Sequence, residues 1–147
     1  MNIRTVATKP LFRFCVAVVV TQLCASAAAT HMTLMDLEQM GVSIPLSMRL
    51  QTTGFDVMAT APFFLGLAVA AMASALGVLR IIPAITSATG RIAVLMVLNG
   101  TLLVAINGLV NMFAGIAVVA GFRGFGIIGL AVAGLIGAAS YGFFLKR

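Results

Sequence analysis

Three long apolar stretches constrain this 147-residue chain more than any other feature of its sequence. They cover residues 62–82, 92–120 and 127–145, and the only charged side chain within them is Arg80, near the end of the first. A helix needs about 20 such residues to cross a bilayer. Every backbone N–H and C=O must be paired inside the protein in hydrocarbon, and unbroken apolar runs lack the alternation of a membrane β-barrel. The sequence therefore predicts an all-α integral membrane protein.

The composition agrees with this fold class and argues against others. Hydrophobic residues make up 62% of the chain and charged residues only 8%, whereas ordinary globular domains carry about 25% charged residues. The net charge of +6 does not indicate a nucleic-acid partner, because the basic residues are spread over chain ends and connections rather than gathered in a patch. We expect the lipid bilayer and other membrane helices as partners, and no nucleic acid.

A fourth apolar stretch, at about 11–29, has two interpretations. A basic start, an apolar core and the small residues at 25–29 are the layout of a cleavable signal peptide. If the stretch is a retained helix, Cys15, Gln22, Ser26 and Ala29 share one stripe, as expected of a buried packing face. We favour the retained helix. The prediction is one membrane domain over 1–147 with a four-transmembrane-helix bundle, or three helices if the first segment is removed.

The charges predict the orientation of the helices. In the four-helix arrangement, seven of the nine basic residues fall on one side, namely Arg4, Lys9, Arg13, Arg80, Arg91, Lys146 and Arg147. Cytoplasmic connections of membrane proteins carry the excess of Lys and Arg. We therefore expect a multi-pass protein of the inner membrane with both termini in the cytoplasm. The three acidic residues, Asp36, Glu38 and Asp56, then lie outside.

The segment at 30–61 is too polar to span and is predicted to be external and partly helical. Thr30 or Thr33 can cap a short helix that Gly41 ends. Ser43 as a cap and Pro45 as a first-turn proline can open a second helix that runs towards Asp56. An ionisable group at the membrane edge, such as Asp56, is either a functional residue or a charge that fixes the depth of a helix.

The external segment also contains weak candidates for a metal site. His31 is followed by Met32, Met35 and Met40, and thioether and imidazole ligands suit Cu(I). Methionine is also a flexible filler of interfaces, and no Met-x-Met motif or histidine pair is present. We therefore expect no cofactor, and keep external Cu(I) binding as a third hypothesis.

Small residues recur at helical steps in the three later apolar stretches. Such rows let two helix backbones approach closely, which drives helix association in membranes. The expected packing residues are Gly66, Ala70 and Ser74 in the first stretch, Gly100 and Gly108 in the second, and two rows in the third, Gly129-Ala133-Gly137 and Gly134-Ala138-Gly142. Two rows on the last helix predict two close contacts, one each with the stretches 62–82 and 92–120, or one with another subunit.

The stretch 92–120 carries the amides Asn99, Asn107 and Asn111. On a helical projection, Asn107 and Asn111 share the glycine side, while residues such as Leu95 occupy the opposite, lipid-facing side, and Asn99 lies at the edge. An unpaired amide near the bilayer midplane costs several kcal/mol, so these groups need partners. The expected polar cluster joins them to Gln22, Ser26, Ser74 and Asp56, as structural hydrogen bonds or as a polar pathway.

No catalytic motif is present, and three families of small membrane proteins are excluded by missing residues. A proton-coupled multidrug exporter needs a glutamate in its first helix, a disulfide generator needs external cysteine pairs, and a haem anchor needs membrane histidines. In architecture the chain resembles small multi-pass inner-membrane proteins of bacteria. We predict a non-enzymatic membrane subunit, scaffold or assembly partner. The alternative is a small oligomeric transporter or channel with an Asn-lined pathway.

Overall fold

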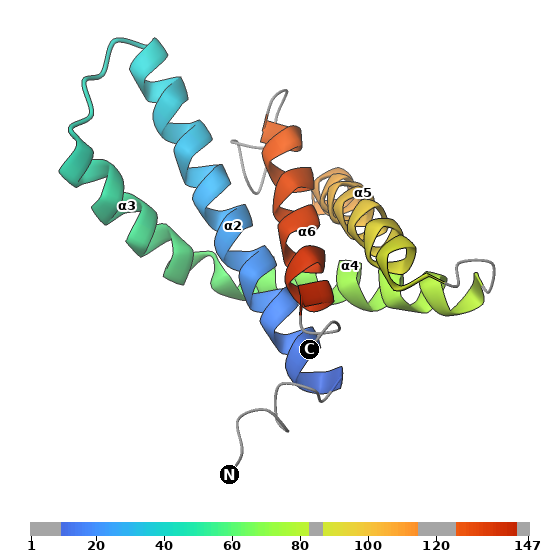
Figure 1. Ribbon diagram of the computed structural model, residues 1–147. Helices are drawn as coiled ribbons and strands as arrows, with labels where there is room; N and C mark the ends of the chain where they lie inside the picture. The colour runs from blue at the N-terminus through green and yellow to red at the C-terminus, as the bar shows by residue number, and fades with distance from the viewer. Residues whose placement is uncertain (1–9, 83–86, 115–125, 144–147) are drawn as a thin grey trace.

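The computed structural model describes residues 10–82, 87–114 and 126–143, and these ranges form five α-helices (Figure 1). The helices are α2 (Pro10–Gln39), α3 (Leu46–Ala59), α4 (Ala61–Ile81), α5 (Ala88–Ala114) and α6 (Gly126–Phe143). All except α3 are long and apolar enough to cross a membrane. The prediction of an all-helical chain with four long apolar helices is therefore confirmed within the described ranges. Residues 115–120 and 144–145 of the predicted spans lie outside them.

Helix α2 is longer than the first predicted span, because it continues without a break through residues 30–39. The expectation that Thr30 or Thr33 caps a separate helix is wrong. Their hydroxyls lie 3.0 Å from the carbonyls of Ser26 and Ala29, four residues back, and donate to them within the helix. The chain turns only at Gly41, the predicted terminator, whose φ of 89° is a conformation that suits glycine.

The junction of α3 and α4 is a single residue, Thr60. A helix opens here as predicted, but Pro45 is the N-cap of α3 rather than a first-turn residue, and no side chain caps the helix, so the prediction of Ser43 as the cap is wrong. Thr60 ends α3 with its backbone N–H bonded to the carbonyl of Asp56, and Pro62 lies in the first turn of α4. The chain can change direction here because a proline in the first turn needs no backbone donor.

The four apolar helices form a closed ring in which each helix packs against two neighbours. α6 lies between α2 and α5, and α4 contacts the same two helices from the other side. All four contribute to both parts of the core. One part contains Ala25, Ala29, Phe64, Leu67, Ala71, Leu103, Leu130 and Ala133, and the other Ala17, Val18, Ala68, Met72, Ala75, Leu79, Leu95 and Ala138.

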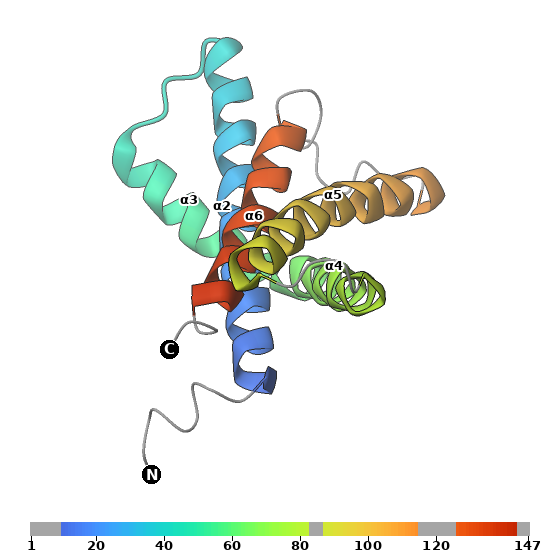
Figure 2. The ribbon, with the colours of Figure 1, turned by 45° about the vertical axis from the view of Figure 1, so that its right-hand side comes forward.

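The helices of the ring are not all parallel. α2 and α6 lie side by side and run in opposite directions, so the start of α2 and the end of α6 share one end of the molecule (Figures 1 and 2). α4 runs across this pair, and α5 leads away from it (Figure 2). α3 packs against α2 and α4 outside the ring and buries no side chain fully.

Candidate functional site

A hydrogen-bonded cluster lies where α2 passes the junction of α3 and α4. We call it the polar junction and define it by Gln22, Ser26, Thr30, Asp56 and Thr60. The three members on α2 are buried and stand at steps of four residues, so they form one stripe along the helix. This stripe faces the end of α3, where the chain turns into α4.

The hydrogen bonds of the polar junction form a directed chain. The Thr60 hydroxyl donates to the Asp56 carbonyl over 2.6 Å, so the proton in the 2.9 Å contact between Ser26 and Thr60 comes from Ser26. The Gln22 Nε2 group donates to the Ser26 hydroxyl over 3.2 Å and to the Val57 carbonyl over 3.0 Å. The Asp56 carbonyl thus accepts both the backbone N–H and the hydroxyl of Thr60, and Gln22 adds a donor for the Val57 carbonyl in the last turn of α3.

Thr30 ties the Asp56 side chain to α2. Its hydroxyl lies 3.0 Å from Asp56 Oδ2 and 3.0 Å from the Ser26 carbonyl, and it shares one proton between them. Among the candidates from the sequence, Gln22, Ser26 and Asp56 thus come together. Thr30 and Thr60 were missed as members, although the spacing Gln22, Ser26, Thr30 is visible in the sequence as a continued step of four.

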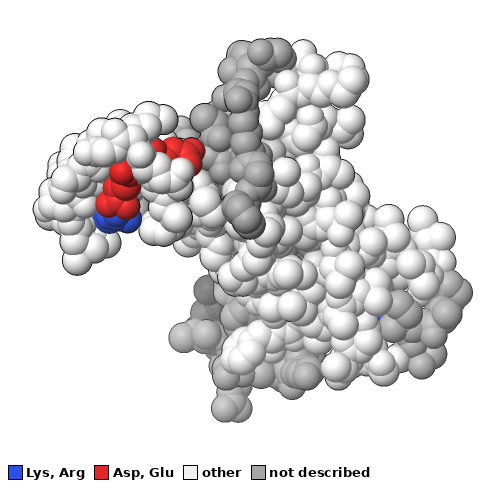
Figure 3. All heavy atoms as spheres, turned by 90° about the horizontal axis from the view of Figure 1, so that it is seen from above, with Lys and Arg blue, Asp and Glu red and all other residues white. Residues whose placement is uncertain are grey.

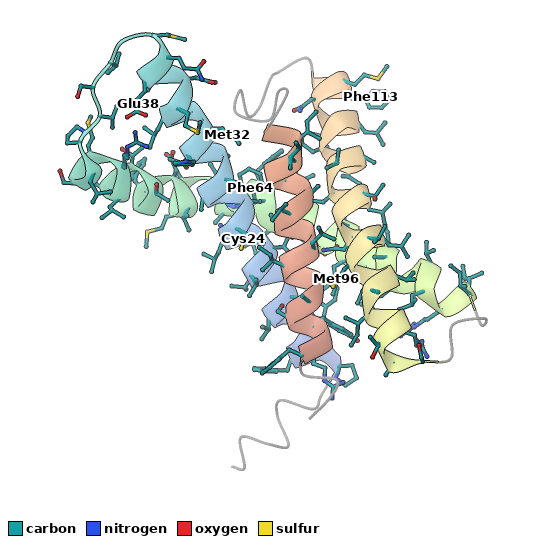
Figure 4. The ribbon with its side chains drawn as sticks, turned by 45° about the horizontal axis from the view of Figure 1, so that its top comes forward. Cys24, Met32, Glu38, Phe64, Met96 and Phe113 are labelled. Atoms are coloured by element: carbon teal, nitrogen blue, oxygen red, sulfur yellow. The ribbon has the colours of Figure 1, made fainter. Side chains whose placement is uncertain are left out.

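The outer end of the hairpin formed by α2 and α3 is held by an ion pair between Glu38 and Arg49. Glu38 lies on the side of α2 that faces α3 (Figure 4). Seen from above, red and blue atoms meet over this hairpin and the rest of the described face is nearly uncharged (Figure 3). The hairpin is therefore fixed at both ends, by the ion pair and by the polar junction.

The amides of α5 do not join the polar junction. Asn99 is fully buried at 0% exposure, and its Nδ2 group donates to the Gly134 carbonyl of α6 over 2.7 Å. Asn107 is 4% exposed, and the side-chain oxygens of Asn99, Asn107 and Asn111 have no hydrogen-bond partner among the described residues. Ser74 is exposed on α4. The single polar cluster expected from the sequence is thus divided, and Ser74 belongs to neither part.

The buried side of α5 differs from the projection. Leu95, expected to face lipid, is buried, and Gly108, expected to face protein, is exposed with nothing within 4 Å of an added Cβ. The rotation follows from the closest contact of α5 with α6. A Cβ on Gly134 would lie 2.7 Å from Gly100 Cα, so the helices approach at this pair of glycines, which places Asn99 and Leu95 inside.

The two small-residue rows of α6 face two different helices. In the row 129–137, a Cβ on Gly137 would lie 2.9 Å from the Ala17 carbonyl, and one on Gly129 would lie 3.3 Å from Ala28 Cβ, so this row packs on α2. The row 134–142 packs on α5, where a Cβ on Gly142 would meet the Ile92 side chain at 2.7 Å. The partner of the first row is the stretch 11–29 rather than 62–82.

The small-residue row of α4 has no partner helix in the part of the chain that the structure describes. Gly66, Ala70 and Ser74 are exposed, and an added Cβ on Gly66 or Gly77 would have nothing within 4 Å. The opposite side of α4 faces the ring with larger side chains, among them Phe64, Leu67 and Met72. This side also buries Ala68, Ala71 and Ala75, so the row at 66, 70 and 74 is the small-residue row of α4 that points outward.

The weak metal candidates lie near the end of α2. His31, Met35 and Met40 are exposed and Met32 is partly buried. The described residues contain no group of three His, Cys, Asp or Glu side chains that could hold a metal ion. Cys15 and Cys24 are free thiols, and Cys15 is exposed rather than part of the buried stripe. The first turns of α2 extend beyond its buried section, which starts at Ala17.

The described fold and its polar junction define an all-helical protein with a ring of four apolar helices and an attached helical hairpin, consistent with a membrane protein. No protein-family model matches the chain, and no curated protein or solved structure shows significant similarity to it.

Proposed function

We propose that this chain is a non-enzymatic subunit, scaffold or assembly partner of a bacterial-type inner membrane, which associates with another membrane helix through α4. We call the surface formed by Gly66, Ala70, Ser74 and Gly77 the α4 small face. The observation that carries the proposal is the exposure of this face, since the two small-residue rows of α6 are covered by neighbouring helices.

The physics of helix association in a bilayer explains why the α4 small face can bind another helix. Lipid tails are as apolar as leucine, so no hydrophobic effect draws helices together, and close backbone approach supplies the attraction. A row such as Gly66, Ala70 and Ser74 permits that approach. The larger side chains of Val69 and Val78 border the α4 small face on its two sides and limit its width. A second copy of this chain and a different membrane protein both fit this description.

The orientation proposed for the complex follows from charge. Arg80 lies in the last turn of α4 and Arg91 in the first turns of α5, while the acidic residues lie between 36 and 56. The excess of basic residues at the chain ends and at the connection between α4 and α5 supports cytoplasmic termini and an external hairpin of α2 and α3.

The test is the subunit number of the purified protein in mild detergent, measured by native mass spectrometry. We expect the double change Gly66→Leu and Ala70→Leu to remove the associated helix or subunit, because two added side chains hold the backbones apart. Ala105→Leu with Gly108→Leu is the matched control, since both residues are exposed on α5 and together gain the same bulk. Unchanged association in the double variant, or equal loss in the control, would contradict the proposal.

A second function, an oligomeric transporter or channel, is supported by the side-chain oxygens of Asn107 and Asn111, which lack partners in the described chain. A neighbouring subunit or a polar solute could supply the missing donors. The double change Asn107→Leu and Asn111→Leu should abolish solute flux in reconstituted vesicles if the amides line a pathway. Flux that persists in this variant argues for the scaffold instead.

A further inference from the structure

A cavity of about 420 Å³ lies at the end of the ring where α4 ends, α5 begins and α6 ends. Leu76, Leu79, Ile92 and Leu95 form its apolar walls, and Leu79 and Leu95 are buried. Arg80 and Arg91 line the same cavity and are exposed, and Tyr141 of α6 completes it. The cavity therefore combines an apolar interior with a cationic edge.

The two arginines of this cavity have no acidic partner in the part of the chain that the structure describes. Asp36, Glu38 and Asp56 are the only acidic residues of the sequence, and they belong to the hairpin of α2 and α3. Two guanidinium groups beside one cavity repel each other unless an anion lies between them. Guanidinium groups also bind phosphate oxygens with two parallel hydrogen bonds, so phosphate is the anion they suit best.

We infer that this cavity binds an anionic phospholipid, with its phosphate between Arg80 and Arg91 and part of an acyl chain against the leucine walls. The apolar walls favour a lipid over free phosphate, because an inorganic anion gains nothing from Leu76 or Ile92. Basic pockets between membrane helices on the cytoplasmic side are typical sites for anionic headgroups. Tyr141 also fits a site at the boundary between acyl chains and headgroups, because its ring is apolar and its hydroxyl is polar.

The test compares lipid retention by the full chain, purified in mild detergent and incubated with phosphatidylglycerol or phosphatidylcholine. Native mass spectrometry counts the bound lipids on the monomer peak. We expect one tightly retained phosphatidylglycerol and a roughly 25-fold weaker affinity after Arg80→Gln with Arg91→Gln, about fivefold for each lost charge. Arg49→Gln is the charge control, because Arg49 lies in the hairpin and pairs with Glu38.

A second variant separates the lipid from free phosphate. Leu76→Trp keeps both arginines and fills part of the cavity, so it should reduce phosphatidylglycerol retention by at least tenfold. Millimolar inorganic phosphate should displace little lipid from the unaltered protein. Equal retention of both lipids, unchanged retention in the double arginine variant, or full displacement by phosphate with no effect of Leu76→Trp would overturn the inference.

These measurements are independent of the association through the α4 small face. The lipid is counted on the monomer, and none of the variants changes Gly66, Ala70 or Ser74. A protein that retains lipid but shows no association dependent on the α4 small face, or that shows this association without lipid, would therefore sustain one proposal and contradict the other.

Discussion

The contact between Gly134 and Gly100 is a point where one added carbon atom is expected to have a large effect. A Cβ on Gly134 would lie 2.7 Å from Gly100 Cα and 3.0 Å from its nitrogen, so a backbone rather than a flexible side chain must move. We expect Gly134→Ala to lower the free energy of unfolding by about 1–3 kcal/mol, the usual cost of overpacking. Denaturant titration in mixed detergent and lipid micelles measures this change.

Gly108→Ala is the matched control for this prediction. The same methyl group is added to the middle of an apolar helix, but nothing lies within 4 Å of it. Stability should stay the same or rise by up to about 1 kcal/mol, because alanine restricts the unfolded chain more than glycine does. An equal loss in both variants would show that the close approach of α5 to α6 is not the cause.

At the scale of the elements, the polar junction couples α3 to α2. The Thr30 hydroxyl lies 3.0 Å from Asp56 Oδ2, so Thr30→Val and Asp56→Ala remove the same interaction. In a double-mutant cycle we expect the two losses of stability to be non-additive by about 1 kcal/mol. Faster amide hydrogen exchange in α3, with α6 unaffected, would locate the change in the hairpin.

Asp36 provides the control for this cycle. It lies six residues further along α2 than Thr30 and is exposed. Thr30→Val and Asp36→Ala should therefore add without coupling. Additive effects for the Asp56 pair as well would mean that the carboxylate does not hold α3 in solution.

The elements also show how far the sequence alone could lead. The apolar helices were predictable, because length and hydropathy decide whether a segment can be buried in lipid. The end of α2 was not predictable, because a threonine hydroxyl can either cap the start of a helix or bond to a carbonyl of the preceding turn. Thr30 and Thr33 do the latter. The spacing of small residues indicated packing rows on both α4 and α6, but it did not show which rows a neighbouring helix covers.

Which rows are covered depends on neighbours that a sequence pattern does not contain. Gly137 of α6 packs on α2, whereas Gly66 of α4 faces outward, on the side opposite the buried Phe64 and Leu67. The same limit applies to the amides. Their burial on α5 could be inferred from their cost in lipid, but the bond from Asn99 to the Gly134 carbonyl requires the relative rotation of two helices.

At the scale of the whole molecule, the packing of α2 predicts that residues 11–29 are retained. Cleavage after Ala29 would remove Ala17, Thr21, Gln22 and Ser26, which are buried in the ring or in the polar junction. It would also expose the row 129–137 of α6 to lipid. We expect the intact mass of the membrane-extracted protein to include these residues, whereas a chain beginning at Thr30 or His31 would contradict the four-helix ring.

The orientation of the molecule gives the last prediction. In a background with Cys15→Ser and Cys24→Ser, a single cysteine is placed by Val42→Cys in the hairpin turn or by Ser87→Cys before α5, both at exposed positions. Because basic residues collect on the cytoplasmic side, a membrane-impermeant maleimide should label the position at 42 in intact cells. The position at 87 should react only after the membrane is opened.

The opposite labelling pattern would reverse the sides of the membrane assigned to the hairpin and to the cavity. The hairpin with its ion pair of Glu38 and Arg49 would then face the cytoplasm. The cavity of Arg80 and Arg91 would then face the outer leaflet. Arginine is attracted less strongly there, because the negative surface potential of anionic lipids belongs to the cytoplasmic leaflet. Labelling at both positions in intact cells would instead mean that α4 does not cross the membrane, since it connects these two regions through α3. The pattern of labelling thus tests the orientation, the span of α4 and the leaflet available to the cavity in one experiment.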